Sequence, residues 1–304
     1  MTRKALVLGG GGPVGIAWES GLLAGFAEAG VDLSDADFIL GTSAGSFVGA
    51  QLAMGARPAS LAAPFLAMGE TPQEAKTEAK AAPSRDPARP APDLTVLMRK
   101  MAEAASGVRP AQEVRAEIGA WALEQSPMSE DAFIQSFGRF LAELPADAWP
   151  AKGYACTAVD AEDGAFRLWD KASGVGLARA VASSCSVPGV YPPITIQGRR
   201  YIDGGMRSAV NADMATGHDR VVVVAIRVAG GAGEAAERMR LALDAELQVL
   251  RDGGARVQLV TPDAASVAAF GPNLMDMRRR PQAALAGVAQ GRACAEAIGA
   301  AWNG

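Results

Sequence analysis

Residues 37–54 read DFILGTSAGSFVGAQLAM. The segment 37–40, an aspartate followed by three apolar residues, is typical of a short buried strand, and the almost wholly apolar segment 44–54 predicts a helix that is buried on all sides. The same order occurs upstream, where the apolar run 5–8 stops at four glycines and a helix with Pro13 in its first turn follows. Two strand–helix units within the first 55 residues predict an α/β fold that begins with parallel strands.

The composition changes after Gly69. Five prolines lie between residues 70 and 93, which indicates a surface excursion rather than core. Helical spacing then predicts three helices, at 94–106, 111–124 and 130–144. We therefore interpret residues 70–150 as a helical insertion with the character of a lid.

Strand patterns return beyond residue 150. Two β-hairpins are predicted, with turns at 162–164 and 197–198 and strands at 153–159, 165–169, 194–196 and 200–202. Further strands are expected at 221–228 and 256–260, and further helices at 234–250 and 280–302. Together these elements predict an α/β protein whose central sheet is mostly parallel.

Charge and cysteine content exclude several classes of protein. The 304 residues include 29 Lys and Arg against 33 Asp and Glu, a net charge of −4, whereas a nucleic-acid-binding protein normally has a basic excess. Three widely spaced cysteines form neither a disulfide framework nor a metal-binding motif, so we expect no metal and a reducing compartment. The sequence contains neither an apolar run of the roughly 18 residues that span a membrane nor the apolar core of a signal peptide. We therefore expect a cytoplasmic protein.

The pentapeptide from Gly41 to Gly45 matches the G-x-S-x-G motif between a strand and a helix. Acyl transfer needs a serine oxygen that projects from a sharp turn, and the two flanking glycines leave room for such a turn around Ser43. The N-terminus of the following helix favours the negative charge that develops there. Ser43 is therefore the candidate nucleophile, and the alternative is a capping serine in an ordinary strand-to-helix turn.

A second glycine motif, G-x-G-x-x-G, occurs at Gly10, Gly12 and Gly15, again after a strand and before a helix. A dinucleotide-binding unit would need an acidic residue at the end of the second strand, but the nearby acids precede that strand, so we expect no cofactor. Glycines leave backbone N–H groups accessible at the positive end of a helix, which makes Gly10, Gly11 and Gly12 candidates for an oxyanion hole. A tight packing turn is the alternative.

A serine nucleophile needs a base, and the chain has a single histidine, His218. This residue precedes the predicted strand 221–228, whereas the active sites of parallel sheets gather where the strands end. We therefore expect His218 to lie in a surface turn, although an α/β-hydrolase arrangement with His218 as base stays open.

The stronger candidate for the base is Asp203, which ends a short strand and is followed by Gly204 and Gly205. A carboxylate can serve as base if it is desolvated and hydrogen-bonded directly to the serine. We expect Asp203 to lie at the same end of the sheet as Ser43, which would follow an earlier parallel strand. Asn211 is expected as a helix cap or as a donor that holds the carboxylate. An aspartate that opens an ordinary turn is the alternative.

Together these residues resemble the patatin-like phospholipase family. The glycine loop 9–15, the elbow 41–45 and the pair Asp203-Gly204 occur in the family's order, and the block 182–193 is similar to the segment ahead of the family's aspartate. The resemblance implies one three-layer α/β/α domain over residues 1–304. It also implies a serine–aspartate dyad without histidine and the hydrolysis of lipid acyl esters.

For this chain the resemblance implies that Ser43 forms the acyl intermediate, Asp203 is the base, the backbone from Gly10 to Gly12 is the oxyanion hole, and no cofactor takes part. One departure is Val14, where many members of the family have Lys or Arg, a position that bears on turnover and headgroup preference. Two alternatives stay open: an esterase of the α/β-hydrolase type that depends on His218, and a catalytically silent member of the fold that binds lipid.

Two further features concern a lipid or acyl-ester partner. Apolar stripes in the insertion are predicted to lie over the site and line an acyl pocket, although such stripes are also typical of plain core. They are formed by Leu94, Leu97, Met98, Met101, Phe133, Phe137 and Phe140. Residues 278–280 are three arginines, which predict weak peripheral contact with anionic headgroups or else form a solvated face.

Overall fold

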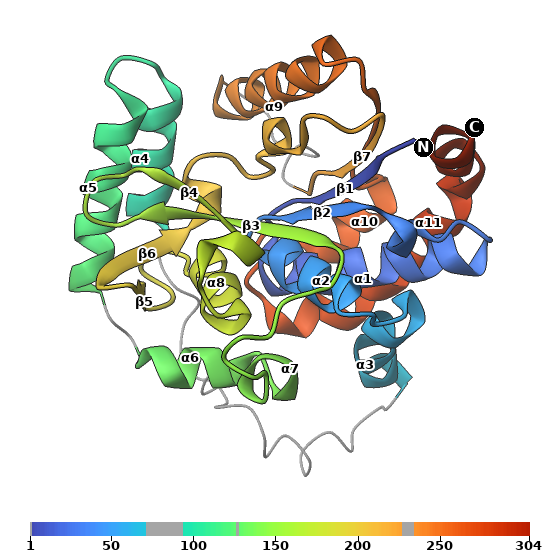
Figure 1. Ribbon diagram of the computed structural model, residues 1–304, viewed down its shortest axis with the longest axis horizontal. Helices are drawn as coiled ribbons and strands as arrows, with labels where there is room; N and C mark the ends of the chain where they lie inside the picture. Colours follow the sequence, from blue (N-terminus) through green and yellow to red (C-terminus); the bar gives the residue numbers. More distant parts are fainter. Residues whose placement is uncertain (1, 71–93, 126–127, 227–233) are drawn as a thin grey trace.

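A computed structural model describes residues 2–70, 94–125, 128–226 and 234–304, with a mixed β-sheet at its centre (Figure 1). The strands are β1 (Lys4–Leu8), β2 (Phe38–Gly41), β3 (Gly153–Asp160), β4 (Phe166–Asp170), β5 (Ile194–Ile196), β6 (Arg199–Asp203), β7 (Arg220–Val224) and β8 (Arg256–Val260). Their order is β5-β6-β3-β2-β1-β7-β8, and β4 pairs with β3.

Strand direction divides the sheet into two parts. The pairs β1–β2, β1–β7, β2–β3 and β7–β8 are parallel, whereas β3–β4, β3–β6 and β5–β6 are antiparallel. Both predicted hairpins form, and Gln197 and Gly198 both have positive φ, as a tight hairpin turn requires. The predicted α/β fold with a mostly parallel sheet is therefore confirmed.

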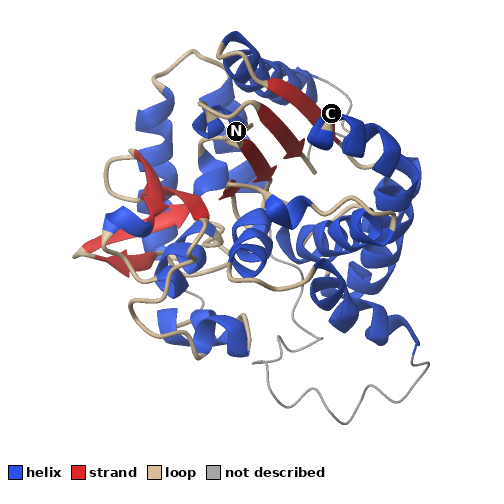
Figure 2. Ribbon diagram, turned by 45° about the vertical axis from the view of Figure 1, so that its right-hand side comes forward, coloured by secondary structure: helices blue, strands red, loops and turns tan. Residues whose placement is uncertain are grey.

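Helices cover both faces of the sheet, which gives the expected three layers (Figures 1 and 2). The covering helices are α1 (Gly12–Glu28), α2 (Ala44–Ala53), α9 (Glu234–Asp252) and α11 (Arg280–Asn303). Alternate strand residues point to opposite faces. Leu6 and Ile39 pack in one buried cluster with α1, α2 and α11, while Val7 and Leu40 pack in another with α9.

Helices α1 and α11 pack at close backbone distance, in a contact that we call the α1–α11 seam. A Cβ atom on Gly21 would lie 2.2 Å from the Ala284 carbonyl oxygen, and one on Gly287 would lie 2.3 Å from the Trp18 carbonyl oxygen. Neither position can hold a side chain without separating the helices. Since α1 begins at the glycine loop, the seam fixes the helix that carries this loop.

The predicted insertion forms helices α4 (Thr95–Ala105), α5 (Ala111–Glu124), α6 (Glu130–Ser136) and α7 (Arg139–Ala142). The first two helices confirm the prediction. The single helix predicted for 130–144 is wrong, because the chain breaks at Gly138, whose φ of 74° is incompatible with a right-handed helix. The break lets Phe137 and Phe140, on either side of it, both contact Phe47.

Three helices were not expected from the sequence: α3 (Pro58–Glu70), α8 (Leu177–Ser184) and α10 (Ala264–Phe270). They are short or rich in small residues, so their apolar spacing is weak. The proline-rich excursion at 70–93 lies outside the described residues except for its first residue, which ends α3. The strand predicted at 221–228 pairs only as far as Val224, and its last two residues are also outside the described part.

Candidate active site

Ser43 lies in the turn between β2 and α2 with φ 52° and ψ −117°, a conformation that a non-glycine residue rarely adopts. The turn is tight on both sides of the serine. A Cβ atom on Gly41 would lie 2.3 Å from the Ser46 Cα, and one on Gly45 would lie 2.1 Å from the Leu8 carbonyl oxygen. The sharp turn predicted for this motif is therefore present, its serine is strained, and the two glycines are the residues that permit it.

The strained serine is held by three neighbours. Its backbone N–H donates to the Ser184 hydroxyl at 3.0 Å, and its carbonyl oxygen accepts from the Ser46 hydroxyl at 2.6 Å and from the Cys185 thiol at 3.1 Å. Sequence analysis assigned no role to Ser184 or Cys185. The sequence signal that could have indicated a role is their position in the block 182–193. The C-terminal end of α8, which lies in this block, contacts the elbow.

Two strands share one edge of β3, and their meeting point defines the site. Ala158 of β3 pairs with β4 and also with Asp203 of β6, while Cys156 pairs with β4 and also with Gly41 of β2. A strand residue has one neighbour on each edge, so β4 occupies one edge of β3, and β2 and β6 occupy the other. Since β2 is parallel to β3 and β6 is antiparallel, β2 and β6 run toward each other.

The ends of β2 and β6 meet beside Thr157, which brings the segments of Ser43 and Asp203 together. This corrects one expectation, because Asp203 does not end a strand parallel to that of Ser43 but approaches head-on. The Asp203 side chain is 2% exposed, and its Oδ1 accepts from the Gly205 N–H at 2.7 Å. Gly204 lies directly against Thr157. Thr157 in turn shares a 2.9 Å hydrogen bond with the Thr42 hydroxyl.

Asn211 supports this meeting point, but not in the way that was expected. Its amide Nδ2 donates to the Ser208 carbonyl at 2.7 Å and to the Thr42 hydroxyl at 3.1 Å, while its Oδ1 accepts from Arg207 at 2.8 Å. It neither binds the Asp203 carboxylate nor caps a helix with its side chain. The fully buried amide instead ties the end of β2 to the segment after Asp203.

The glycine loop offers fewer free donors than the sequence suggested. The Gly10 N–H donates to the Ala209 carbonyl at 2.7 Å, whereas no acceptor among the described residues takes the N–H groups of Gly11 and Gly12. Gly15 continues α1 with an N–H that donates to the Gly11 carbonyl. The two free donors lie at the positive end of α1, where they can stabilise an oxyanion.

One small cavity, of about 40 Å³, brings the predicted groups together. Its wall includes Ser43, Asp203 and the loop from Gly10 to Gly12, and we call it the central cavity. No cluster of His, Cys, Asp or Glu in the described ranges could hold a metal ion. The central cavity therefore contains a hydroxyl, a carboxylate and backbone donors, which are the groups that acyl transfer uses.

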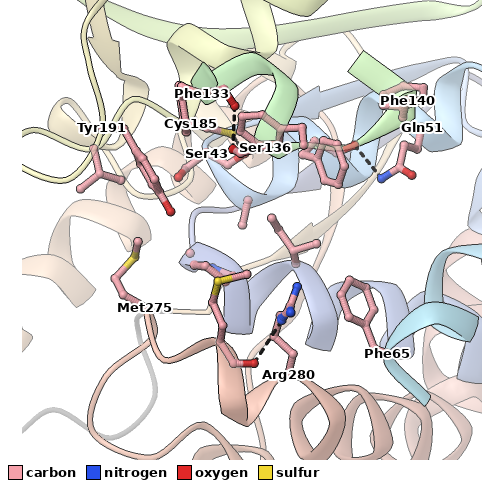
Figure 3. A pocket seen from close by; sticks show the side chains of 18 of the residues that line it. Ser43, Gln51, Phe65, Phe133, Ser136, Phe140, Cys185, Tyr191, Met275 and Arg280 are labelled. Carbon is pink, nitrogen blue, oxygen red and sulfur yellow. Dashed lines mark hydrogen bonds between the residues drawn. The ribbon is translucent and has the colours of Figure 1, made fainter. Parts of the chain in front are cut away.

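A larger cavity of about 380 Å³, which we call the main cavity, opens beside Ser43 (Figure 3). Aromatic and aliphatic side chains form most of its wall, including Phe47, Phe65, Phe133, Phe137, Phe140, Tyr191 and Met275. Figure 3 shows Ser43 and Cys185 on one side of this space and Arg280 and Phe65 on the other. Its volume and apolar lining are typical of a site for an organic ligand.

Described helices of the predicted insertion line the two cavities that contain Ser43. The phenylalanines of α6 and α7 line the main cavity, and four residues of α4 and its N-cap line the central cavity: Leu94, Leu97, Met98 and Met101. Phe133 is also fully buried, and Leu97 is almost fully buried. Both side chains therefore belong to the hydrophobic core as well as to a cavity wall.

The structure places His218 away from Ser43. Its ring stacks on Phe38 at 5.2 Å, and Nδ1 lies 2.9 Å from the Ala215 carbonyl oxygen. Phe38 is the first residue of β2, whereas Ser43 follows the last one. At about 3.3 Å per residue, this places the two groups roughly 15 Å apart along the strand direction. The geometry disfavours an arrangement in which His218 is the base.

Several ionisable groups are buried beneath the elbow. Glu19 of α1 is fully buried, and its carboxylate oxygens make no well-formed hydrogen bond to another described residue. Burial raises the pKa of Glu19 well above its usual value, and the Gly9 N–H opposes this only in part. Burial likewise raises the pKa of Cys185 well above normal and that of Cys156 to about 12, so both thiols are protonated and unreactive.

The three arginines at 278–280 do not form one patch. Arg278 pairs with Asp276 at 2.8 Å on the surface, whereas Arg280 lines the main cavity with its Nε bonded to the Met277 carbonyl. In the described ranges, no helix has both the length and the apolar character needed to cross a membrane. Peripheral contact through these arginines stays a prediction.

The site thus belongs to an α/β protein with a strained serine at a strand–helix turn. A protein-family model described as patatin-like phospholipase matches residues 6–216, so the chain belongs to the patatin-like phospholipase family. The family is one of lipid hydrolases. No curated protein sequence matches the chain.

Two solved structures are similar in fold. VipD from Legionella pneumophila is 14% identical, with a TM-score of 0.46, over 98% of this chain and 67% of its own. The type III effector protein ExoU is 17% identical, with a TM-score of 0.35, over 96% of this chain and 54% of its own. The chain thus spans about two thirds of the first structure and about half of the second.

Proposed function

We propose that this protein hydrolyses carboxylic esters of lipids through an acyl-Ser43 intermediate. The observation that carries the proposal is the central cavity, whose wall contains Ser43, Asp203 and the glycine loop. A serine held in a strained turn, a buried carboxylate and two unpaired N–H groups form a set that neither a packing turn nor a simple lipid-binding site requires.

In the first step, Ser43 Oγ attacks the ester carbonyl while Asp203 accepts the hydroxyl proton. The new Oγ–C bond forms, the negative charge on the carbonyl oxygen is stabilised by the N–H groups of Gly11 and Gly12, and the C–O bond to the alcohol breaks. The proton on Asp203 passes to the departing alcohol oxygen. Water then attacks the acyl-serine with Asp203 again as base, which releases the fatty acid and restores Ser43.

The main cavity is the natural place for the acyl chain. It contains Ser43 but not Asp203, and its wall is mostly apolar. Burying a methylene group contributes about 0.8 kcal/mol, so a cavity of this kind favours a chain of many carbons over acetate.

The experiment that tests the proposal measures release of fatty acid from p-nitrophenyl esters and from phospholipids by the protein and by Ser43→Ala. We expect the wild-type protein to hydrolyse long-chain esters and to be labelled by a serine-directed fluorophosphonate, and the variant to show neither property. A labelled but inactive protein would require a different substrate class. An unlabelled and inactive protein would favour the catalytically silent lipid-binding alternative.

A further inference from the structure

A third cavity, of about 240 Å³, lies between α4, α5, α9 and the segment that follows Asp203. Four methionines line it, and we call it the methionine cavity: Met98, Met101, Met206 and Met239. Methionine side chains are flexible and adapt to aliphatic ligands of different shape.

The three cavities adjoin one another through shared lining residues, with the candidate dyad between the two larger ones. The central cavity shares Gly12, Ser43, Val187 and Met275 with the main cavity. It shares Met98, Met101, Gly205, Met206 and Ala209 with the methionine cavity. A substrate bound at Ser43 can therefore extend in two directions.

The proposed chemistry decides which half of the ester takes which direction. Asp203 must return its proton to the alcohol oxygen, so the alcohol half has to leave on the side of Asp203. Asp203 lines the central cavity, and the next residues Gly205 and Met206 line the methionine cavity. The acyl half therefore lies in the main cavity and the alcohol half in the methionine cavity.

The methionine cavity also contains an uncompensated positive charge. Its wall includes the arginines Arg115 and Arg207 and also the carboxylate of Glu246. Arg207 is neutralised by Asp213, which it contacts through two nitrogens. Arg115 is half-buried, its Nε donates to the Gly164 carbonyl at 2.9 Å, and no carboxylate among the described residues lies within 4.0 Å of its guanidinium.

The surroundings of Arg115 favour an anion. Burial and the neighbouring Arg207 lower the pKa of Arg115 from its usual value, which means that its charge lacks compensation. Glu246 does not form an ion pair with Arg115; its carboxylate instead accepts the Ala212 N–H at 2.7 Å, and burial raises its pKa. A phosphate would supply the oxygen acceptors that a guanidinium binds best.

We propose that the methionine cavity binds the alcohol half of the ester and that Arg115 selects substrates with a phosphate on that half. The inference rests on the proposed function, because it takes its direction from the proton returned by Asp203. Arg115 is thus proposed as the residue that determines specificity for the alcohol half of the ester.

The test compares dioctanoyl phosphatidate with dioctanoylglycerol, which differ by the phosphate alone, in micelles of a neutral detergent. We expect the wild-type protein to prefer the phosphorylated ester. Arg115→Met should lower kcat/KM for the phosphorylated ester about 10- to 100-fold, since the variant loses charge-assisted hydrogen bonds to the phosphate. Its kcat/KM for the neutral ester should stay within about three-fold of wild type. Arg115→Lys, which keeps the charge, should recover part of the preference.

Arg139→Met is the matched control, because it removes the same charge from an exposed side chain that lines none of the three cavities. It should leave the preference unchanged; an equal loss in both variants would mean that bulk attraction to the anionic micelle is the cause. Equal losses of both substrates in Arg115→Met, or no preference in the wild type, would overturn the proposal. Thermal melting of each variant shows whether it is folded.

Two further measurements separate the sources of the effect. Millimolar inorganic phosphate should not alter hydrolysis of the neutral ester; a change that Arg115→Met removes would mean that free phosphate is an effector at this site. If neither ester is cleaved and Ser43 is not labelled by a fluorophosphonate, the proposed function itself fails. If the neutral ester is cleaved without regard to Arg115, the inference about Arg115 alone fails.

Discussion

The two walls of the candidate site are fixed by different means. The sheet wall, made of segments 9–12, 41–46 and 203–205, is placed by backbone hydrogen bonds and by glycines that touch neighbouring backbone. The insertion wall, made of segments 94–101 and 133–140, is placed by contacts between side chains. The candidate reacting groups lie on the sheet wall, while many of the apolar side chains of the two cavities lie on the insertion wall. We infer that the first determines whether an ester is cleaved and the second which ester is cleaved.

The largest effect is expected from Asp203→Asn on the sheet wall. The variant keeps the size of the side chain but loses the proton acceptor, and removing a general base typically costs about 10²–10⁴-fold in rate. His218→Ala is the control and should stay within a few-fold of wild type, because His218 stacks on Phe38 at the far end of β2. Steady-state hydrolysis of a p-nitrophenyl ester measures both. An active Asp203→Asn together with an inactive His218→Ala would support the His218-dependent alternative.

The second prediction concerns stability and compares one glycine in each wall. Gly45→Ala places a Cβ atom 2.1 Å from the Leu8 carbonyl, so the elbow has to move, and we expect a loss of about 3 kcal/mol or more in the free energy of unfolding. Gly138→Ala meets no atom within 4 Å and has only its φ of 74° to accommodate, which should cost about 1 kcal/mol. Urea unfolding of both variants measures the difference. Equal losses would show that the two walls do not differ in rigidity.

The third prediction concerns the insertion wall. Phe137→Ala enlarges the main cavity and removes contacts to Phe47 and Phe133. We expect kcat/KM to fall about 10-fold for a long-chain p-nitrophenyl ester and to change little for the acetate, since the lost apolar contact concerns the chain alone. A parallel loss for both esters would place Phe137 in the reacting machinery instead.

The smallest effect is expected from Glu19→Gln beneath the sheet wall. Because the pKa of Glu19 is raised in the folded protein, the folded state keeps a proton that the unfolded state releases above its ordinary pKa, about 4.3. Stability should therefore fall as the pH rises above that value, and the glutamine variant should lack this part of the loss. We expect the Tm of Glu19→Gln to exceed that of wild type by a few degrees at pH 8 and to match it near pH 4.

Glu143→Gln is the control for this comparison, because it removes the same charge from an exposed position on the insertion. Its Tm should follow the wild-type pH dependence. A Glu19→Gln variant that is less stable than wild type at pH 8 would mean that the carboxylate is ionised and compensated in the folded protein.

The sequence predicted the sheet wall better than the insertion wall, and the reason is physical. Gly41, Ser43 and Gly45 are needed for a tight local turn of the backbone. A short sequence motif is enough to predict such a turn. The head-on approach of Asp203 depends on an antiparallel pairing between β3 and β6, which are separated by a hairpin and by α8. No local pattern encodes that pairing.

Tertiary contacts explain the other differences. The Gly10 N–H is occupied by Ala209, and Asn211 binds Thr42 rather than the carboxylate, because segments distant in sequence converge there. On the insertion wall, the spacing of Phe133, Phe137 and Phe140 correctly predicted that these side chains line a cavity. The break at Gly138 was missed because an isolated glycine is tolerated in many helices.

The α1–α11 seam has a consequence for the order in which the protein becomes active during its synthesis. Helix α1 ends at Glu28 and α11 begins at Arg280, so the ribosome must translate nearly the whole of the intervening chain before the partner of α1 exists. Until then Gly21 and Gly25 of α1 have no α11 backbone to pack against. The glycine loop at the start of α1 therefore lacks the contact that fixes its helix. A nascent chain can therefore assemble its serine turn early but should acquire the proposed esterase activity only after α11 has left the exit tunnel.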